Sequence, residues 1–384
     1  MSKVTDTPFD VDALIADPEI RVVVCCGSGG VGKTTTAAAL ALRAAEEGRR
    51  VVVLTIDPAL RLAQSLGLTA LDNTPRPVAG VDTSKGGSLD AMMLDMKRTF
   101  DEVVEAHATP DKAAQILQNP FYQAMSSSFA GTQEYMAMEK LGQLRTQMAD
   151  GERDWDLVIV DTPPSRSALD FLDAPKRLGS FLDGRFIRLL MAPARAGGRA
   201  GLKIFSAGVN VASMVMTKLL GGQMLQDVQT FVAATDTMFG GFRERAEQTY
   251  ALLGRPETAF VVVAAPERDA VREASYFIER LASDGMPLAG VVVNRAQVLG
   301  AKQLGAGRAE EAADRLESEG SGHSLAAALL RIHVDLAETA TRHRGVIGRF
   351  RASHPGIGVK VVPTQAVDVH DIDGLREIGA ALGA

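Results

Sequence analysis

The segment from Val22 to Thr36, VVVCCGSGGVGKTTT, constrains this chain more than any other. Three valines and two cysteines predict a buried strand, and the alanine-rich run that continues to Arg43 predicts a helix. Between them, residues 27–34 match the pattern G-x-x-x-x-G-K-[ST], whose glycines let backbone N–H groups surround phosphate oxygens. Lys33 can reach the outer phosphates, and the Thr34 hydroxyl can bind Mg²⁺. Strand, loop and helix together predict a nucleotide-binding site.

Composition and charge narrow the class of protein. The chain has 384 residues, of which 46% are hydrophobic and 23% charged, as is ordinary for a globular protein. Its net charge of -6 argues against a general nucleic-acid binder. No apolar run is long enough to span a bilayer, and we expect no signal peptide. The only cysteines, Cys25 and Cys26, are neighbours in the first predicted strand, which suits buried residues in a reducing cytoplasm.

Two carboxylates follow apolar strands and are candidates for the chemistry of the site. Val51–Ile56 is typical of a buried parallel strand, and it ends in Asp57, where a carboxylate would point toward the ligand crevice. Asp57 could instead cap a short helix predicted over Pro58–Leu66, and both roles could hold together. Leu157–Val160 is a second such strand and ends in Asp161. Beside a phosphate site, that carboxylate can bind Mg²⁺ directly or through a water.

Two blocks of the chain are helical in pattern. The first includes residues 88–107, 111–118 and most of 120–150, and it contains no convincing strand. The second covers residues 174–253. Both are rich in methionine, which suits either an adaptable groove for a hydrophobic protein client or an ordinary helical core. The methionines in or between these blocks are Met92, Met93, Met96, Met125, Met136, Met138, Met148, Met191, Met214, Met216, Met224 and Met238.

Strands resume after the second block. We predict them over residues 259–264, 290–293 and 358–362, with helices over 272–285, 371–382 and much of 305–353. This alternation predicts an α/β fold with a doubly wound, mostly parallel sheet and an inserted helical subdomain, that is, a P-loop NTPase. We expect one such domain over residues 1–384, with the nucleotide-binding core at about 18–90, 154–175 and 255–384. The helical subdomain is expected at about 91–150 and 176–253.

With these pieces placed, the chain resembles the ArsA-like ATPases, which include arsenite-pump ATPases and the ATPases that deliver tail-anchored membrane proteins. That family has the motifs GKGGVGKTT, TDPAHSL and DTAPTGHTLRFL, and this chain reads GSGGVGKTT, TIDPALRLAQSL and DTPPSRSALDFL. Asn294 in GVVVNR matches the asparagine at a strand end of the family, and Val362-Pro363 matches the loop after its last strand. The likeness covers nearly the whole chain, with three motifs in the same order.

The resemblance implies a role for each matching residue. It implies that Asp57 orients the attacking water, that Thr34 and Asp161 hold Mg²⁺, and that Asn294 reads the adenine of ATP beside Pro363. It also implies that ATP closes a two-fold dimer, that hydrolysis opens it, and that the helical subdomains transmit the state. The phosphate-binding residues are then Gly29, Gly30, Val31, Gly32, Lys33, Thr34 and Thr35, with Lys33 also serving catalysis.

Two departures from the family pattern bear on catalysis. Ser28 stands where the family has a lysine that reaches across the dimer to the partner's phosphates, and a serine supplies no such charge. Leu60-Arg61 replaces His-Ser in the first switch, so Arg61 is a candidate for part of the lost charge. The chain could therefore be a slow ATPase as a homodimer, or it could pair with a related chain that brings the lysine. We expect the heterodimer, because the remaining catalytic residues are intact.

Cysteine content argues against three specialised relatives. A thiophilic arsenite site needs several convergent thiols, a zinc-bridged dimer needs a CxxC, and an iron–sulfur reductase needs cluster cysteines. The alternative function is that of a partition- or division-site-type P-loop ATPase, a nucleotide-gated binding module without a hydrophobic client. The C-terminal segment DIDGLREIGAALGA lacks the basic amphipathic character that membrane attachment of such a protein would use.

Overall fold

The structure is a computed structural model, and it describes residues 8–57, 61–120, 122–123, 126, 132–163, 244–301 and 303–384. The chain divides into two compact units. The first unit comprises Met1–Met92, Asp154–Arg166 and Leu253–Ala384, and the second comprises Met93–Arg153 and Ser167–Leu252. Each unit is described by itself.

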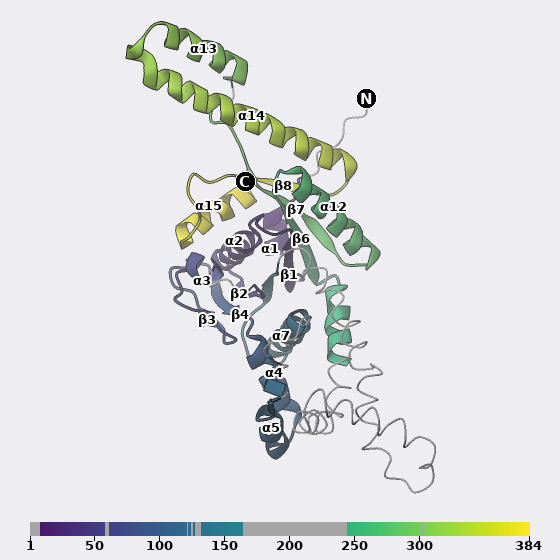
Figure 1. The fold of residues 1–384 in the computed structure, drawn as a ribbon. Coiled ribbons are helices and arrows are strands. Elements are labelled where there is room, and N and C mark those ends of the chain that lie inside the picture. The colour runs from purple at the N-terminus through teal and green to yellow at the C-terminus, as the bar shows by residue number, and fades with distance from the viewer. Residues whose placement is uncertain are drawn as a thin grey trace, which may run out of the picture. The chain divides into compact units, whose positions relative to one another are not determined.

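The first unit is built on a twisted sheet of eight strands among the described residues, in the order β3-β4-β2-β5-β1-β6-β7-β8 (Figure 1). The strands from β2 to β8 in this order pair in parallel. Their runs of valine, isoleucine and leucine are almost wholly buried, as in a parallel sheet covered on both faces. The expected doubly wound, mostly parallel sheet is confirmed. These strands are β1 (Val22–Gly27), β2 (Arg50–Thr55), β5 (Leu157–Asp161), β6 (Thr258–Ala264), β7 (Leu288–Ala296) and β8 (Val359–Pro363).

Residues 88–93 are a strand, so the prediction of a helix from residue 88 is wrong. Strand β4 (Ser88–Met93) lies between β2 and the short edge strand β3 (Arg76–Pro77), with which it pairs antiparallel. Leucine, alanine and methionine favour a helix locally, but pairing and burial of Leu89 and Met92 decide the conformation here. The helix α4 (Met96–His107) begins only after Asp95, whose side chain accepts a hydrogen bond from the amide of Arg98.

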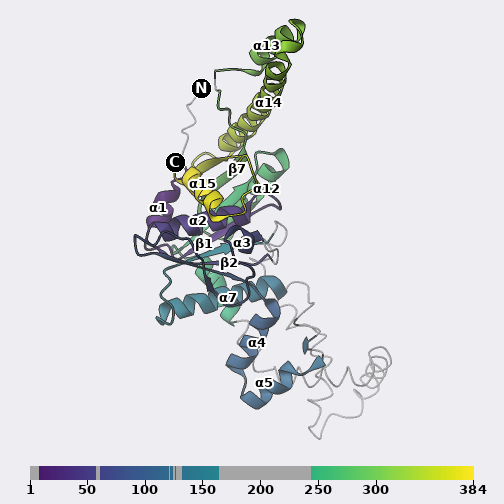
Figure 2. The ribbon, with the colours of Figure 1, turned by 90° about the vertical axis from the view of Figure 1, so that its left-hand side faces the viewer.

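Helices cover both faces of this sheet. Helix α2 (Lys33–Glu46) packs on β1, β2 and β5, and α15 (Ile372–Gly383) packs on α2. Helix α12 (Arg268–Ser283) packs on β6 and β7 and lies on the opposite side of the sheet from α2 and α15 (Figures 1 and 2). The short helices α1 (Val11–Ala16) and α3 (Arg61–Ser65) both contact α2.

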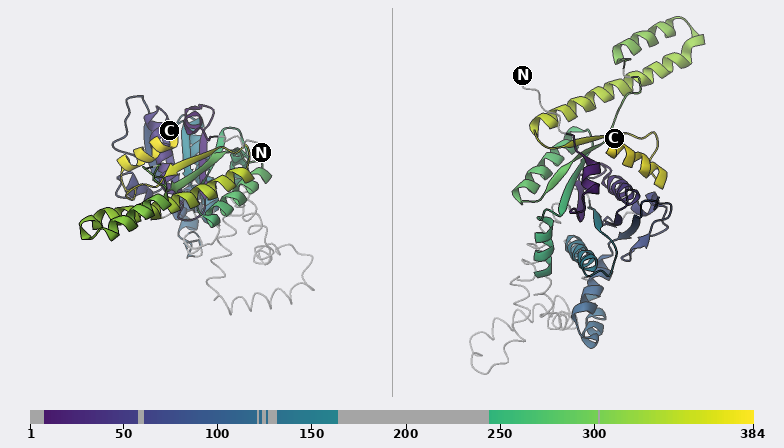
Figure 3. Two further views of the ribbon diagram at one scale, coloured as in Figure 1. Left: turned by 90° about the horizontal axis from the view of Figure 1, so that it is seen from above. Right: turned by 180° about the vertical axis from the view of Figure 1, so that it is seen from behind.

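A helical hairpin follows β7 in the chain. Helix α13 (Ala306–Ser318) is joined by the 3₁₀ turn η1 (Ser321–His323) to the long helix α14 (Ser324–Ser353), and the two helices pack along each other. Figure 3 shows this hairpin extending well beyond the sheet. Its base is tied to the sheet where the amide of Gln297 donates to Nδ1 of His343 at 3.0 Å.

The described helices of the second unit are α4, α5 (Pro110–Leu117), α7 (Thr132–Ala149) and residues 244–252. Met136 and Met138 are fully buried in this unit, and Arg245 forms an ion pair with the buried Glu139 at 2.9 Å. These two methionines therefore belong to a helical core. No helix in the described residues is long and apolar enough to cross a membrane. The predictions for residues 174–243, and those for Met125, Met191, Met214, Met216, Met224 and Met238, lie outside the described residues.

Candidate functional site

The phosphate-binding loop joins β1 to α2 at the carboxyl edge of the sheet. Gly32, the residue before the helix, has φ of 90°, a left-handed conformation that glycine adopts without strain. A Cβ at this position would lie 2.3 Å from Nδ2 of Asn294. A Cβ on Gly27 would lie 2.0 Å from the carbonyl oxygen of Val263 on the neighbouring strand. Both glycines are thus required by the close approach of the loop to β6 and β7.

Lys33 lies within this loop structure and not on the open surface. The residue is buried, with 7% of its surface exposed, and Nζ donates a hydrogen bond to the carbonyl oxygen of Ser28 at 2.8 Å. Burial lowers the pKa of the Lys33 amine, and the carboxylates of Asp161 and Asp57 act in the opposite direction. The amine therefore links the two ends of the phosphate loop, at the wall of the cavity where phosphate oxygens would bind.

Ser28 gives the loop no charge and no outward-facing group. The residue is 8% exposed, and its Oγ is buried with no hydrogen-bond partner among the described residues. An uncompensated buried hydroxyl of this kind is uncommon in proteins.

Asp161 lies fully buried at the end of β5, in register with Cys25 of β1 and Thr55 of β2. The Thr55 hydroxyl donates to Oδ2 of Asp161 at 2.9 Å, whereas Oδ1 has no hydrogen-bond partner in the described part of the chain. Burial raises the pKa of the Asp161 carboxyl to about 6, and hydrogen bonds from Thr34 and Thr55 partly counteract this. The carboxylate is thus next to the Thr34 hydroxyl and has one unsatisfied oxygen.

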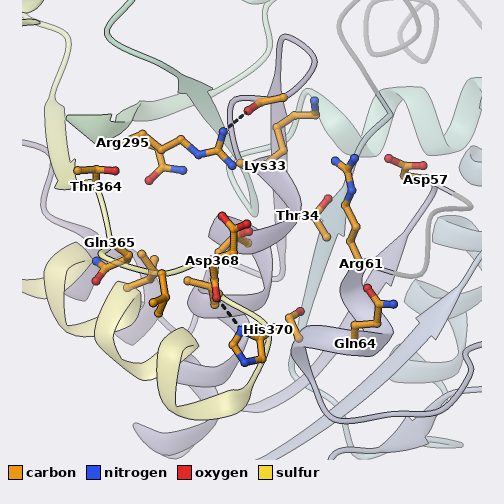
Figure 4. A pocket seen from close by; sticks show the side chains of 18 of the residues that line it. Lys33, Thr34, Asp57, Arg61, Gln64, Arg295, Thr364, Gln365, Asp368 and His370 are labelled. Atoms are coloured by element: carbon orange, nitrogen blue, oxygen red, sulfur yellow. Dashed lines mark hydrogen bonds between the residues drawn. The ribbon is translucent and has the colours of Figure 1, made fainter. Parts of the chain in front are cut away.

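Asp57 and Arg61 lie on the wall of the same cavity, with Gln64 and Ser65 of α3. Figure 4 shows the Asp57 carboxylate and the Arg61 guanidinium near the end of the Lys33 side chain. Residues 58–60 between them, which include the predicted proline break, lie outside the described residues. Asp57 therefore lies at the cavity, where the sequence predicts that a carboxylate after strand β2 should point.

Strand β7 holds the phosphate loop through two successive residues. Nδ2 of Asn294 donates to the carbonyl oxygen of Val31 at 3.0 Å, and Nη1 of Arg295 donates to that of Gly30 at 2.9 Å. Arg295 has φ of 59°, which is unusual for a residue with a side chain. The strand continues to Ala296, so Asn294 lies near its end, as expected, with two further strand residues after it.

The cavity has a volume of about 600 Å³, a size typical of a site for a small ligand. Among the predicted site residues, its wall includes Gly30, Gly32, Lys33, Thr34, Thr35, Asp57, Asn294 and Pro363. Val31 and Asp161 are buried behind this wall, and Gly29 is exposed on the loop.

The segment between β8 and α15 supplies wall residues that the sequence interpretation did not name. Thr364, Gln365, Asp368 and His370 line the cavity across from α3 (Figure 4). The only sequence signal for them was their position directly after the last strand, where the carboxyl edge of a parallel sheet forms its crevice. Thr162, which follows Asp161, was also missed, and its hydroxyl donates to the carbonyl oxygen of Cys25 at 2.8 Å.

Comparisons with known proteins agree with this geometry. The sequence model of the family described as Anion-transporting ATPase matches residues 20–304. The ATPase ARSA2 of Chlamydomonas reinhardtii is 24% identical over 80% of this chain and 75% of that protein. The ATPase ASNA1 homolog of Babesia bovis is 27% identical over 82% of this chain and 76% of that protein. A putative arsenical pump-driving ATPase of Halobacterium salinarum is 29% identical over 50% of this chain but only 30% of that protein.

Proposed function

This chain belongs to the anion-transporting ATPase family, whose members are ATP-dependent, and we propose that it is a nucleotide-driven switch that binds and hydrolyses ATP in the cavity at the edge of the sheet. One observation carries the proposal. The phosphate loop after β1, Asp57 after β2 and Asp161 at the end of β5 come together at the carboxyl ends of three adjacent parallel strands. This is the arrangement that phosphoryl transfer needs.

Each residue of the cavity would have a separate role in ATP hydrolysis. Lys33 and the backbone N–H groups of residues 29–35 would hold the phosphates, and Asp57 would orient a water. The water oxygen forms a bond to the γ-phosphorus while the bond from that phosphorus to the bridging oxygen of ADP breaks. The products are ADP, inorganic phosphate and a proton. Such a reaction depends on positioning and on neutralised charge more than on covalent help from the protein. Asn294 and Pro363 would contact the adenine.

The residues around Thr34 and Asp161 fit a magnesium ion. Both side chains offer the oxygen ligands that Mg²⁺ prefers, and the buried Oδ1 of Asp161 has no hydrogen-bond partner among the residues that the structure describes. Thr34 would bind the ion, and Asp161 would bind it directly or accept a hydrogen bond from one of its waters. When bound, the ion would neutralise charge on the β- and γ-phosphates.

We further propose a dimer whose closure follows ATP binding, with the helical part of the chain as the region that contacts a client or partner. The neutral Ser28 supports a heterodimer in which a related chain supplies a lysine to this site. Met92, Met136 and Met138 are fully buried, which leaves the other methionines of the helical blocks as candidates for a client groove. The adjacent cysteines Cys25 and Cys26 are buried free thiols, which suits a cytoplasmic location.

Two variants test the assignment of the site. Lys33→Ala should abolish hydrolysis and weaken ATP binding measured by calorimetry, because the amine that meets the phosphates is lost. Asp57→Asn should keep ATP binding while hydrolysis falls at least about 10-fold, the loss expected when a water is no longer positioned. Unchanged ATP affinity and turnover in Lys33→Ala would exclude this cavity as the site. Equal loss of binding and turnover in Asp57→Asn would instead support a capping role for Asp57.

A further inference from the structure

The cationic side chains on the cavity wall differ in what they contact. Nζ of Lys33 donates to the Ser28 carbonyl oxygen, and the Arg295 guanidinium donates to that of Gly30. Arg61 makes no hydrogen bond or ion pair with any residue in the described part of the chain, although it lines the same cavity. Its guanidinium, with five N–H donors, is thus available to a ligand.

The backbone that carries Arg61 is held in place. Arg61 is the first residue of α3, and the next two residues, Leu62 and Ala63, are buried, with exposed fractions of 0% and 2%. The helix packs on α2, which begins with Lys33. The base of the Arg61 side chain is therefore fixed relative to the phosphate loop, and only the side chain itself must be ordered when it meets a ligand.

The Arg61 guanidinium lies on the wall of the cavity that also holds Lys33 and Asp57, the groups proposed to act on the phosphates and the water. In Figure 4 it is near the end of Lys33 and near Asp57, on the side of the cavity away from Gln365 and His370. The transferring phosphoryl group spreads negative charge over three oxygens, and a planar guanidinium can donate to two of them at once. Ser28, which is neutral and buried, adds no charge there.

We infer that Arg61 is a catalytic residue that donates to the γ-phosphate of ATP within its own chain and so supports the slow turnover of the chain alone, to which a partner's lysine would add. The inference rests on the proposed ATPase function and adds to it. An arginine supplied by the same chain stabilises the transition state in some other nucleotide hydrolases. Arg61 is placed by α3, whose buried face fixes it, to serve in that way here.

A simpler role for Arg61 would be to attract ATP in its ground state. Such a role changes the affinity for ATP, whereas stabilisation of the transition state changes kcat. Arg61→Ala should therefore lower the kcat of the purified full chain by about 10²–10³-fold, the loss seen when one preorganised donor to a developing charge is removed. The KM for ATP should change by less than about threefold.

Two further measurements separate charge from geometry. Arg61→Lys should recover only a minor part of the activity, because an ammonium cannot donate to two oxygens in the guanidinium geometry. The affinity for ADP with aluminium fluoride, which mimics the phosphoryl group in flight, should fall in Arg61→Ala at least about 10-fold more than the affinity for a non-hydrolysable ATP analogue. Arg308→Ala, which removes an exposed arginine from α13, serves as the matched control and should leave all these values unchanged.

The outcomes distinguish this inference from the function on which it rests. Wild-type turnover no faster than that of Lys33→Ala would contradict both. Turnover that depends on Lys33 but survives Arg61→Ala within threefold would overturn only the role of Arg61. A raised KM with an unchanged kcat would do the same, because it would assign Arg61 to ground-state binding.

Discussion

At the scale of single residues, Asn294 shows how a contact in the structure adds to a role implied by sequence. Its amide donates to the Val31 carbonyl oxygen of the phosphate loop, and the residue is 5% exposed. If this bond holds the loop in shape, Asn294→Ala should weaken the binding of inorganic tripolyphosphate as well as of ATP. We expect a loss of about 3–10-fold for both, in keeping with one hydrogen bond. Calorimetry with the two ligands measures it.

Tripolyphosphate has no base, so it reports on the loop alone. Loss of ATP affinity with unchanged tripolyphosphate affinity would assign Asn294 to the adenine and would refute the role in the loop. Thr364→Ala is the control, because this residue lines the cavity from the segment after β8 and its side chain makes no hydrogen bond to the phosphate loop in the part of the chain that the structure describes. It should leave tripolyphosphate binding unchanged.

At the scale of elements, Arg49 joins the end of α1 to the start of β5. Its half-buried guanidinium donates to the backbone carbonyl oxygens of Ile15, Asp17 and Ile20, and it pairs with the Asp156 carboxylate at 2.6 Å. Arg49→Met would leave these acceptors without their donor, so we expect the free energy of unfolding to fall by about 3 kcal/mol. Thermal unfolding should show a clearly lower midpoint.

The neighbouring Arg50 offers a matched control for this prediction. Its side chain is 48% exposed and reaches Asp156 only at 3.4 Å. Arg50→Met should change the free energy of unfolding by less than about 0.5 kcal/mol, as is usual for an exposed ion pair. Equal effects of the two substitutions would show that charge near Asp156, and not the bonds to the backbone, stabilises this junction.

At the scale of the whole molecule, Ser28 bears on whether one chain is enough. If a partner's lysine completes the site, a related ArsA-like chain should stimulate ATP hydrolysis, and Ser28→Lys should raise the activity of the chain alone. We expect a gain of at least about 10-fold, because a cation at the transferring phosphate is among the largest contributions to such catalysis. Steady-state kinetics and light scattering with ATP measure activity and assembly together.

Each result of this experiment has a definite meaning. Stimulation by a partner, or by Ser28→Lys, supports the heterodimer. Brisk hydrolysis by the unmodified chain that neither change improves would refute it. The buried Ser28 Oγ adds a structural requirement, because a lysine at this position must turn outward from the loop to reach a partner. Ser28→Ala is the control and should have no effect on turnover.

Much of the site could be predicted because its chemistry is local in the sequence. The phosphate loop needs its glycines, Lys33 and Thr34 within eight residues, so their identity and order are visible before any folding. The strands that end in Asp57 and Asp161 are also local signals, because a short apolar run that stops at a carboxylate is typical of a buried parallel strand. The doubly wound sheet followed from the alternation of these runs with helices.

Only the tertiary structure decided the features that depend on which segments meet. Residues 88–93 form β4, against their local preference, because the neighbouring strands β3 and β2 offer pairing and burial that a six-residue window cannot show. The bonds from Asn294 and Arg295 to the phosphate loop join residues more than 260 positions apart. The sequence by itself thus determined the groups that hold phosphate, since these are set by neighbouring residues. The structure determined the walls around them, because packing between distant segments has no signature in any one segment.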